Sequence, residues 1–340
     1  MRPLVVGGLT RALRTYRYIQ AVQRLCRHER FDVVHAVTPC LAADIYQPRG
    51  GTYAETLSRS LALTRSSLVR RVRAFGRRFN IRQQFLMRLE RTLLTGRAAR
   101  VVVAALSDYV HRQVQDLCRA TSGAGPAPPV RVIFNGVDVA AWAADERSRL
   151  RAERRAALGI GDSTPLVLFA AHNFKLKGLG ELIRALARGA ARPDAVLVVA
   201  GRSRPARYQR LARRHALADR VRFVGTASSL RGWYAAADVL AHPTWYDPCS
   251  RVVLEALSLG LPVVTTRYNG AAEAMVPGRH GVVIDEPADA PALTAALERG
   301  LQPELRAACA ADAACFAERY SMARHARELV ALYEERRGTR

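Results

Sequence analysis

From residue 165 to residue 266, short apolar runs alternate with amphipathic stretches, and a polar or glycine-containing loop follows most of the runs. Short continuous apolar runs are typical of strands buried on both faces, and a period of 3.6 is typical of helices. Strands that alternate with helices form a parallel sheet covered on both faces. The predicted elements, a strand first and then alternating, lie at 166–171, 180–188, 195–200, 204–215, 221–224, 230–236, 239–242, 250–259 and 262–266.

Ligands bind such sheets at the carboxyl ends of the strands, so the loops at 171–178, 201–205, 225–229 and 242–250 are expected to form one edge. The first of these loops contains the chain's two lysines, Lys175 and Lys177, and leads into a helix near Gly178. Ammonium groups beside the positive end of a helix favour phosphate. We therefore predict an anion site in this loop.

Residues 242–273 read H-P-T-W-Y-D-P-C-S-R-V-V-L-E-A-L-S-L-G-L-P-V-V-T-T-R-Y-N-G-A-A-E. A Pro-rich loop places Asp247 before a helix that Gly260 ends, and the N-terminus of that helix is a second seat for phosphate. Glu255, one turn into the helix, is suited to accept hydrogen bonds from a vicinal diol such as a ribose. Taken singly, Asp247 also suits a loop N-cap and Glu255 a solvated helix position.

This block resembles the carboxyl-terminal nucleotide-sugar site of the retaining GT-B glycosyltransferases of family 4, or group 1. That family includes lipopolysaccharide-core glucosyltransferases, sucrose synthases and phosphatidylinositol mannosyltransferases. The resemblance implies an α/β fold with two Rossmann-like domains facing a cleft. In the family, two glutamates eight residues apart contact the donor, the first near the sugar and phosphate and the second at the ribose. Asp247 stands at the first position with a shorter side chain, and Glu255 stands at the second.

The resemblance also assigns further donor contacts. Lys177-Gly178 matches a family lysine and glycine, whereas His172 replaces the arginine that usually precedes them by five residues. Lys175 would then supply the missing charge, or a neutral His172 would donate a hydrogen bond; a structural histidine and, for Arg202, a surface arginine remain alternatives. The predicted catalytic residues are Lys177, Asp247 and Glu255. The predicted donor-binding residues are His172, Lys175, Lys177, Gly178, Arg202, Val224, Asp247, Cys249, Ser250, Arg251, Val252 and Glu255.

No metal or cofactor is expected beyond the nucleotide-diphosphate sugar, which is a co-substrate. The six cysteines form no C-x-x-C pair and show no histidine at metal-ligand spacing, so they are interpreted as reduced thiols. The longest apolar runs fall short of a membrane span, so the cytoplasm is the expected compartment.

The amino-terminal half has weaker patterns. A helix is predicted at 13–27 and strands at 31–37, 101–105 and 130–134, and Asn135-Gly136-Val137-Asp138 resembles the family's marker at the end of its first domain. The expected domains are 1–141, a linker with a helix at 142–164, a donor domain at 165–315, and a terminal helix at 316–340 that packs back on the first domain. The family begins with a strand, a glycine-rich loop and a helix that this sequence lacks, so the first domain is expected to be incomplete. A late start, a fragment and a chain that binds donor without turnover all remain open.

The acceptor side is predicted from two segments. His35, in D-V-V-H-A-V, matches the first histidine of the family's D-V-V-H-x-H pattern. Asp44, Gly50 and Gly51 lie in A-D-I-Y-Q-P-R-G-G-T-Y. A structural strand-end histidine and a simple turn are the alternatives.

The formal net charge is +24, and eleven arginines fall between Arg65 and Arg100. Apolar residues between them predict one or two amphipathic helices, interrupted near Gly76 and Asn80. Such a face suits an anionic membrane or an acidic acceptor, and a solvated basic face remains as an alternative. The sequence contains no recognisable nucleic-acid motif.

We therefore expect a hexosyltransferase that acts on a glycolipid, lipopolysaccharide-type or other glycan acceptor with retention of configuration, in the cytoplasm and at the inner face of the cytoplasmic membrane. A nucleotide-sugar-binding fragment without turnover and a basic membrane-surface module are the competing hypotheses.

Overall fold

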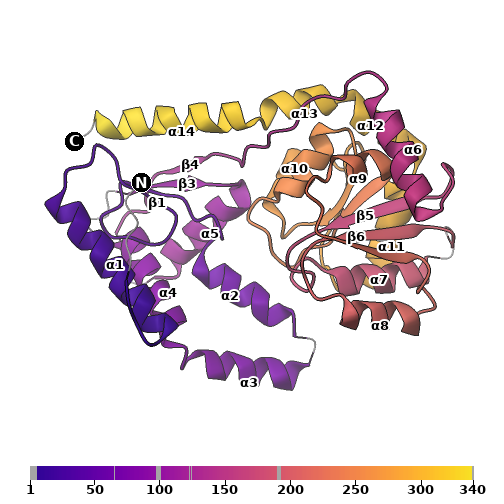
Figure 1. Ribbon diagram of the computed structural model, residues 1–340. Coiled ribbons are helices and arrows are strands. Elements are labelled where there is room, and N and C mark those ends of the chain that lie inside the picture. The colour runs from indigo at the N-terminus through magenta and orange to yellow at the C-terminus, as the bar shows by residue number, and fades with distance from the viewer. Residues whose placement is uncertain are drawn as a thin grey trace. The chain divides into compact units, whose positions relative to one another are not determined.

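The computed structural model describes residues 6–64, 66–96, 101–121, 123, 125–189 and 193–338. The chain divides into two compact units: unit 1 is Met1–Phe134 with Ala326–Arg340, and unit 2 is Asn135–His325. The division falls earlier than the predicted domain end at residue 141. The predicted linker helix is α6 (Glu146–Leu158), which packs against α9 (Arg231–Ala236) and is therefore part of unit 2 (Figure 1).

Unit 2 contains a six-stranded, fully parallel sheet in the order β7-β6-β5-β8-β9-β10, counted over the described residues. The first strand, β5, lies between β6 and β8, so the strand order reverses at this point. This arrangement is that of a dinucleotide-binding Rossmann sheet, whose ligands bind at the reversal. The strands are β5 (Leu166–Ala170), β6 (Val196–Ala200), β7 (Val221–Gly225), β8 (Val239–His242), β9 (Val263–Thr266) and β10 (Gly281–Ile284).

Helices cover both faces of this sheet because its strands are apolar on both sides. On one face α7 packs against α11, with α8 beside α7, and on the other α10 packs against α13 (Figure 1). Each helix and strand predicted between residues 166 and 266 is present, with its ends within two residues of the predicted ones. The remaining helices are α7 (Leu179–Arg188), α8 (Ala206–Arg214), α10 (Arg251–Ser258), the 3-10 helix η1 (Gly270–Ala274), α11 (Ala290–Gly300), α12 (Pro303–Ala311) and α13 (Ala313–Arg319).

Unit 1 contains a parallel sheet in the order β1-β2-β3-β4. Alternate residues of the strands enter two cores: Tyr46 and Val103 pack with residues of α4 and α5, and Ile45 and Val102 pack with Leu332 of α14. Its elements are α1 (Arg11–His28), β1 (His35–Ala36), β2 (Ile45–Tyr46), α2 (Tyr53–Ala62), α3 (Ser67–Arg77), α4 (Ile81–Thr95), β3 (Val102–Ala105), α5 (Asp108–Arg119), β4 (Val130–Val132) and the end of α14 (Met322–Arg337).

The strand predicted at 31–37 is shorter than expected. Only His35–Ala36 forms a strand, because the Asp44 carboxylate accepts a hydrogen bond from Val34 N at 2.8 Å in place of a strand partner. The pattern also failed to predict β2, whose two residues are too few to produce a periodic signal.

Glu90 is a buried carboxyl group inside unit 1, only 1% exposed. Its two oxygens accept hydrogen bonds from Tyr46 Oη at 2.8 Å and from Tyr53 N at 2.7 Å. Burial raises the pKa of Glu90 to about 7, although both hydrogen bonds oppose the shift. Glu90 therefore holds the first residue of α2 in place.

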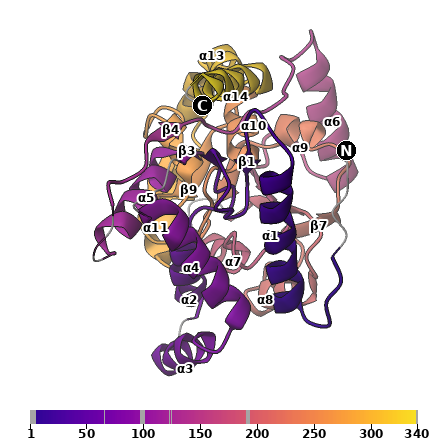
Figure 2. The same ribbon diagram turned by 90° about the vertical axis from the view of Figure 1, so that its left-hand side faces the viewer.

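The predicted basic amphipathic segment forms two helices, α3 and α4, with the break at the expected place. Helix α4 packs against α1, and α3 lies beside α2 at the edge of unit 1 (Figure 2). Arg65, Arg97 and Arg100 of this segment lie outside the described residues. Over the residues that are described, the helices are all too short or too polar to cross a membrane.

Candidate functional site

Two loops meet at the point where the strand order of unit 2 reverses, because the strands that precede them, β5 and β8, are neighbours. The loop after β5 covers residues 171–178, and the loop after β8 covers residues 243–250. Trp245 N and Thr244 Oγ1 both donate to Leu176 O, at 2.9 and 3.2 Å. The two loops are therefore joined by direct hydrogen bonds.

Gly178, at the end of the first loop, is required by this close approach. Its φ is +80°, and a Cβ atom at this position would lie 2.1 Å from Pro243 O. Both the left-handed backbone and the contact exclude a side chain. The glycine thus allows the residue before it, Lys177, to lie against the second loop.

Lys177 and Asp247 form an ion pair between the two loops. Lys177 Nζ lies 2.7 Å from Asp247 Oδ2 and also donates to Tyr246 O at 2.9 Å. Burial by itself would raise the pKa of Asp247, but the charge of Lys177 and the hydrogen bonds from His242 and Lys177 hold that pKa below its ordinary value. Asp247 is therefore an anion near neutral pH.

His242, the last residue of β8, is a site residue that the sequence reasoning did not select. Its buried Nε2 lies 3.5 Å from Asp247 Oδ2 and 3.4 Å from Ser250 Oγ. Burial lowers the pKa of His242, so the ring is mainly neutral at pH 7. Its position at the carboxyl end of a predicted strand was the signal in the sequence that could have identified it.

Helix α10 begins at the same place. Ser250 is its N-cap residue, but the serine side chain makes no capping hydrogen bond, and the N-cap of α7, Gly178, has no side chain to make one. The N-cap side chains therefore leave the first-turn N–H groups of both helices uncapped. The positive end of each helix dipole lies at the same place. Beside Lys177, these two helix ends suit a phosphate group.

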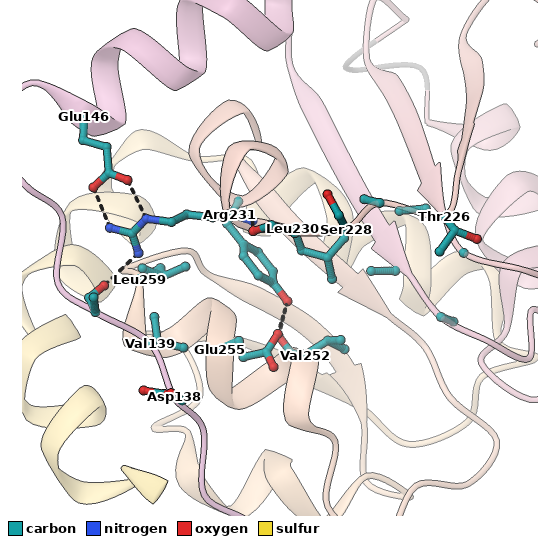
Figure 3. A pocket seen from close by; sticks show the side chains of 18 of the residues that line it. Asp138, Val139, Glu146, Thr226, Ser228, Leu230, Arg231, Val252, Glu255 and Leu259 are labelled. Atoms are coloured by element: carbon teal, nitrogen blue, oxygen red, sulfur yellow. Dashed lines mark hydrogen bonds and ion pairs between the residues drawn. The ribbon is translucent and has the colours of Figure 1, made fainter.

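A cavity of about 880 Å³ opens at the carboxyl ends of β5, β6 and β7 (Figure 3). This volume is in the usual range for pockets that bind small molecules and cofactors. His172 and Gly201 line it from the strand ends, residues 226–230 from the loop after β7, and Val252, Glu255 and Leu259 from α10. Residues 138–141, Ala143 and Glu146 form a further wall.

Glu255 presents its carboxylate to this cavity (Figure 3). Tyr234 Oη donates to Glu255 Oε2 at 2.8 Å, and among the described residues Oε1 accepts no hydrogen bond. Burial raises the pKa of Glu255, whereas the hydrogen bond from Tyr234 and the charge of Arg251 lower it. One carboxylate oxygen is thus fixed, and the other is available to a ligand hydroxyl.

Arg231 holds residues 138–146, which form one wall of the cavity, in place through hydrogen bonds (Figure 3). Its guanidinium group makes two 2.6 Å hydrogen bonds to the Glu146 carboxylate and donates to Ala140 O and Ala141 O at 2.8 and 2.9 Å. The same group lies 4.3 Å from the centroid of the Trp142 ring, and Trp142 Nε1 donates to Leu259 O. Arg231, Glu146 and Tyr234 were not predicted, because no local pattern in the sequence brings them together.

Seven of the twelve predicted donor residues fall into two groups. Lys177, Gly178, Asp247 and Ser250 lie at the joined loops, and His172, Val252 and Glu255 line the cavity. Lys175, Arg202 and Arg251 are exposed, and Val224 lines a separate surface depression beside Phe223 rather than this cavity. Burial raises the pKa of the Cys249 thiol to about 12, and the carbonyl of Cys249 accepts a hydrogen bond from Asn135 Nδ2 at 2.7 Å.

The residues predicted for the acceptor side lie in unit 1. His35 Nδ1 is 2.7 Å from Tyr333 Oη, and Asp44 bonds the backbone of Val34. Gly50 and Gly51 precede Thr52, the N-cap residue of α2, and Gly51 has a φ of +72°. His35 and Asp44 therefore both have structural contacts within unit 1.

In the described part of the chain, no group of three or more His, Cys, Asp or Glu side chains is placed to hold a metal ion.

Residues 164–302 match the profile of the family "Glycosyl transferases group 1". The chain is 32% identical over 178 residues to the lipopolysaccharide glucosyltransferase WaaG of Escherichia coli, and the aligned region covers 51% of this chain and 48% of that protein. It is 33% identical over 239 residues to a D-inositol 3-phosphate glycosyltransferase of Corynebacterium jeikeium, covering 66% of this chain and 55% of the relative. The chain thus spans about half the length of these curated relatives.

Solved structures agree with these matches. The crystal structure of WaaG superposes with a TM-score of 0.71 at 25% identity, over 92% of this chain and 81% of that one. Anabaena HepE in complex with UDP and glucose superposes with a TM-score of 0.67 at 19% identity, over 94% and 81% of the two chains, a likeness of fold. The chain therefore carries a group 1 glycosyltransferase domain at residues 164–302, within an α/β fold of the GT-B class.

Proposed function

We propose that this chain transfers a hexose from a nucleoside-diphosphate sugar to a glycan or glycolipid acceptor, with retention of configuration and without a metal ion. The observation that carries the proposal is the Lys177–Asp247 ion pair between the N-terminal ends of α7 and α10. Negative charge on the diphosphate grows as its bond to the sugar breaks. A fixed cation and two helix ends oppose that growth without reorganising.

The roles of the side chains follow from their environments. Lys177, with Lys175 nearby in the loop, stabilises the leaving diphosphate, and the ionised Asp247 accepts hydrogen bonds from the sugar hydroxyls. Glu255 accepts a hydrogen bond from the ribose through the oxygen that Tyr234 does not use. The acceptor hydroxyl attacks from the face on which the diphosphate departs, so the configuration at the anomeric carbon is retained.

Relatives guide the choice of donor and acceptor. HepE has been solved with UDP-glucose, and WaaG is a lipopolysaccharide glucosyltransferase. We therefore propose UDP-glucose as the first donor to test and lipopolysaccharide core as the first acceptor, with the chain working at the inner face of the cytoplasmic membrane.

The test compares Lys177→Ala and Glu255→Ala with Arg188→Ala, an exposed arginine at the other end of α7 from Lys177. Calorimetry with UDP measures nucleotide binding, and radiolabel moved from UDP-glucose to lipopolysaccharide core measures transfer. We expect both site variants to lose at least about tenfold in UDP affinity and more in transfer, and the control to match the wild type.

The outcomes also separate the competing hypotheses. Nucleotide binding without transfer or donor hydrolysis would identify a nucleotide-sugar binder. If neither site variant changes UDP binding or transfer, the assignment of the site is wrong. Retention is checked by the anomeric configuration of the product in an NMR spectrum.

A further inference from the structure

Cys249 lies in the loop after β8, two residues beyond Asp247, and is buried. Its backbone N–H donates to Asp247 Oδ1 at 3.2 Å. The other carboxylate oxygen, Oδ2, is the one that pairs with Lys177. The backbone of Cys249 therefore holds the oxygen that Lys177 does not contact, and the two interactions together set the direction of the carboxylate group.

The carbonyl group of Cys249 is bonded to a distant part of the chain. Asn135, the first residue of the N-G-V-D turn, donates from Nδ2 to Cys249 O at 2.7 Å, and this contact is buried. A second contact joins the same two residues. Burial raises the pKa of the Cys249 thiol, and a hydrogen bond from the backbone N–H of Asn135 lowers that pKa in part.

Asn135 belongs to a segment that is itself tightly held within unit 2. Its side chain is buried, and Arg324 Nη2 donates to its carbonyl oxygen at 3.3 Å. At the next position, Gly136, a Cβ atom would lie 2.7 Å from Met322 Cα, so the two backbones are in direct contact. Met322 N also donates to Val137 O at 3.0 Å. The Asn135 amide is thus presented to the loop after β8 from a fixed support.

The buried carbonyl of Cys249 depends on this amide. Among the described residues, Asn135 Nδ2 is the one donor to Cys249 O. A buried carbonyl without a partner is unfavourable, so loss of the amide would make the backbone of Cys249 turn toward another donor or water. Because the N–H and the carbonyl belong to the same residue, this turn would also withdraw the N–H from Asp247 Oδ1.

We propose that Asn135 is a positioning residue for sugar transfer, which acts through Cys249 to hold the Asp247 carboxylate in the direction that the sugar of the donor requires. This inference rests on the proposed function, in which Asp247 accepts hydrogen bonds from the sugar hydroxyls. Asn135 does not line the cavity that Glu255 faces. Its removal should therefore affect transfer and leave the binding of the nucleotide unchanged.

The first test is Asn135→Ala, measured with UDP-glucose as donor and lipopolysaccharide core as acceptor. We expect kcat to fall at least about tenfold, because a reacting group is no longer oriented. UDP affinity, measured by calorimetry, should match that of the wild type. The matched control is Thr294→Val, which removes a hydroxyl that donates to Ala185 O at 3.1 Å, between α11 and α7. The control should keep the wild-type kcat, and urea denaturation shows whether both variants are folded.

A double variant tests whether Asn135 acts through Asp247. Asn135→Ala/Asp247→Asn is expected to transfer the sugar no more slowly than Asp247→Asn alone, since the oriented carboxylate is already absent. If the two losses multiply instead, Asn135 acts independently of Asp247 and the proposal is overturned.

The substitution Asn135→Asp provides a pH profile that a simple packing role would not produce. An ionised carboxylate would repel Cys249 O, whereas a protonated carboxyl group can donate to it as the amide does. The rate of transfer relative to the wild type should therefore recover as the pH is lowered from about 8 to about 5, because burial raises the pKa of an aspartate. In Asn135→Ala the same ratio should stay constant. A constant ratio in Asn135→Asp would contradict the proposed hydrogen bond.

Hydrogen exchange separates a failure of this inference from a failure of the proposed function. The exchange of a peptide that covers residues 247–254, followed by mass spectrometry, should be faster in Asn135→Ala and unchanged in Thr294→Val. A wild-type chain that binds UDP-glucose without transferring it would refute the proposed function. In that case faster exchange, with weaker binding of UDP-glucose but not of UDP, would support the positioning role. Unchanged exchange in Asn135→Ala overturns that role in either case.

Discussion

Lys177 Nζ and Asp247 Oδ2 lie 2.7 Å apart, although the two residues are 70 positions apart in the sequence. Their side chains are 17% and 14% exposed, so each charge depends on the other for compensation. The pair joins the loops after β5 and β8, where the strand order of the sheet reverses. Ligands reach an open α/β sheet at this point.

The substitution Asp247→Asn removes the negative charge and keeps the size of the side chain. We expect sugar transfer to fall by about 100-fold, because the amide no longer accepts two hydrogen bonds from the sugar. UDP affinity should not fall, since Asp247 is proposed to contact the sugar end of the donor and Lys177, released from its ion pair, keeps its charge for the diphosphate. Single-turnover transfer and calorimetry with UDP measure the two quantities, and an equal loss in both would contradict this role.

The substitution Tyr234→Phe removes the hydroxyl that bonds Glu255 and leaves the ring. Because that hydrogen bond lowers the pKa of Glu255 against the effect of burial, its loss lets the pKa rise further. As the pH is lowered, UDP binding that depends on the ionised Glu255 carboxylate should therefore begin to weaken at a higher pH in the variant than in the wild type. Calorimetry with UDP from about pH 5 to pH 8 tests this shift. Tyr208→Phe, at a buried tyrosine on α8 outside the cavity, should leave the profile unchanged.

The substitution Arg231→Ala frees residues 138–146, which form one wall of the cavity. The variant loses two hydrogen bonds to Glu146 and two to backbone carbonyls, so we expect UDP affinity to fall about tenfold and proteolysis near Trp142 to accelerate. Arg149→Ala removes an exposed pair with Glu153 and should change stability by less than about 1 kcal/mol. An unchanged protease pattern in Arg231→Ala would show that this wall does not depend on the guanidinium group.

The substitution Gly178→Ala tests the contact between the two loops. The alanine methyl group would clash with Pro243 O, and the alanine backbone would be held in the left-handed region. We therefore expect a loss of roughly 3 kcal/mol or more in the free energy of unfolding. Gly159→Ala is the matched control, because Gly159 has a φ of +69° but open space around its Cβ position. It should lose only about 1 kcal/mol. Equal losses in urea denaturation would mean that the backbone conformation, not the contact, demands glycine at 178.

The substitution Glu90→Gln tests the pH dependence of unit 1. The pKa of Glu90 is raised from 4.5 to about 7 in the folded protein, so its contribution to stability is fully present below the unfolded value. That contribution is lost as the pH rises through about 7. Glutamine mimics the protonated carboxyl and does not titrate. As the pH rises from 5 to 8, the free energy of unfolding of the variant should therefore increase relative to that of the wild type, by up to about 3 kcal/mol. Urea denaturation at the two pH values measures the change, and a constant difference would contradict it.

The strand and helix pattern of unit 2 was predictable because continuous apolar runs that alternate with amphipathic stretches carry a strong local signal. In unit 1 the same reasoning gave too long a strand at 31–37 and missed β2. Strands of two residues owe their place to neighbours such as Asp44, whose hydrogen bond to Val34 N is not visible in the local sequence.

The sequence by itself determined the alternation of elements, the loops that follow the strands, and the candidate residues Lys177, Asp247 and Glu255, because each is encoded by neighbouring residues. Only the tertiary structure decided which residues meet: the pairing of β5 with β8 brought Lys177 to Asp247, and the packing of α6 on α9 brought Arg231 to Glu146. Tyr234 and Arg231 entered the site in this way. Their contacts join segments distant in sequence, and the physical cause is the burial of the sheet's apolar faces, which no local pattern expresses.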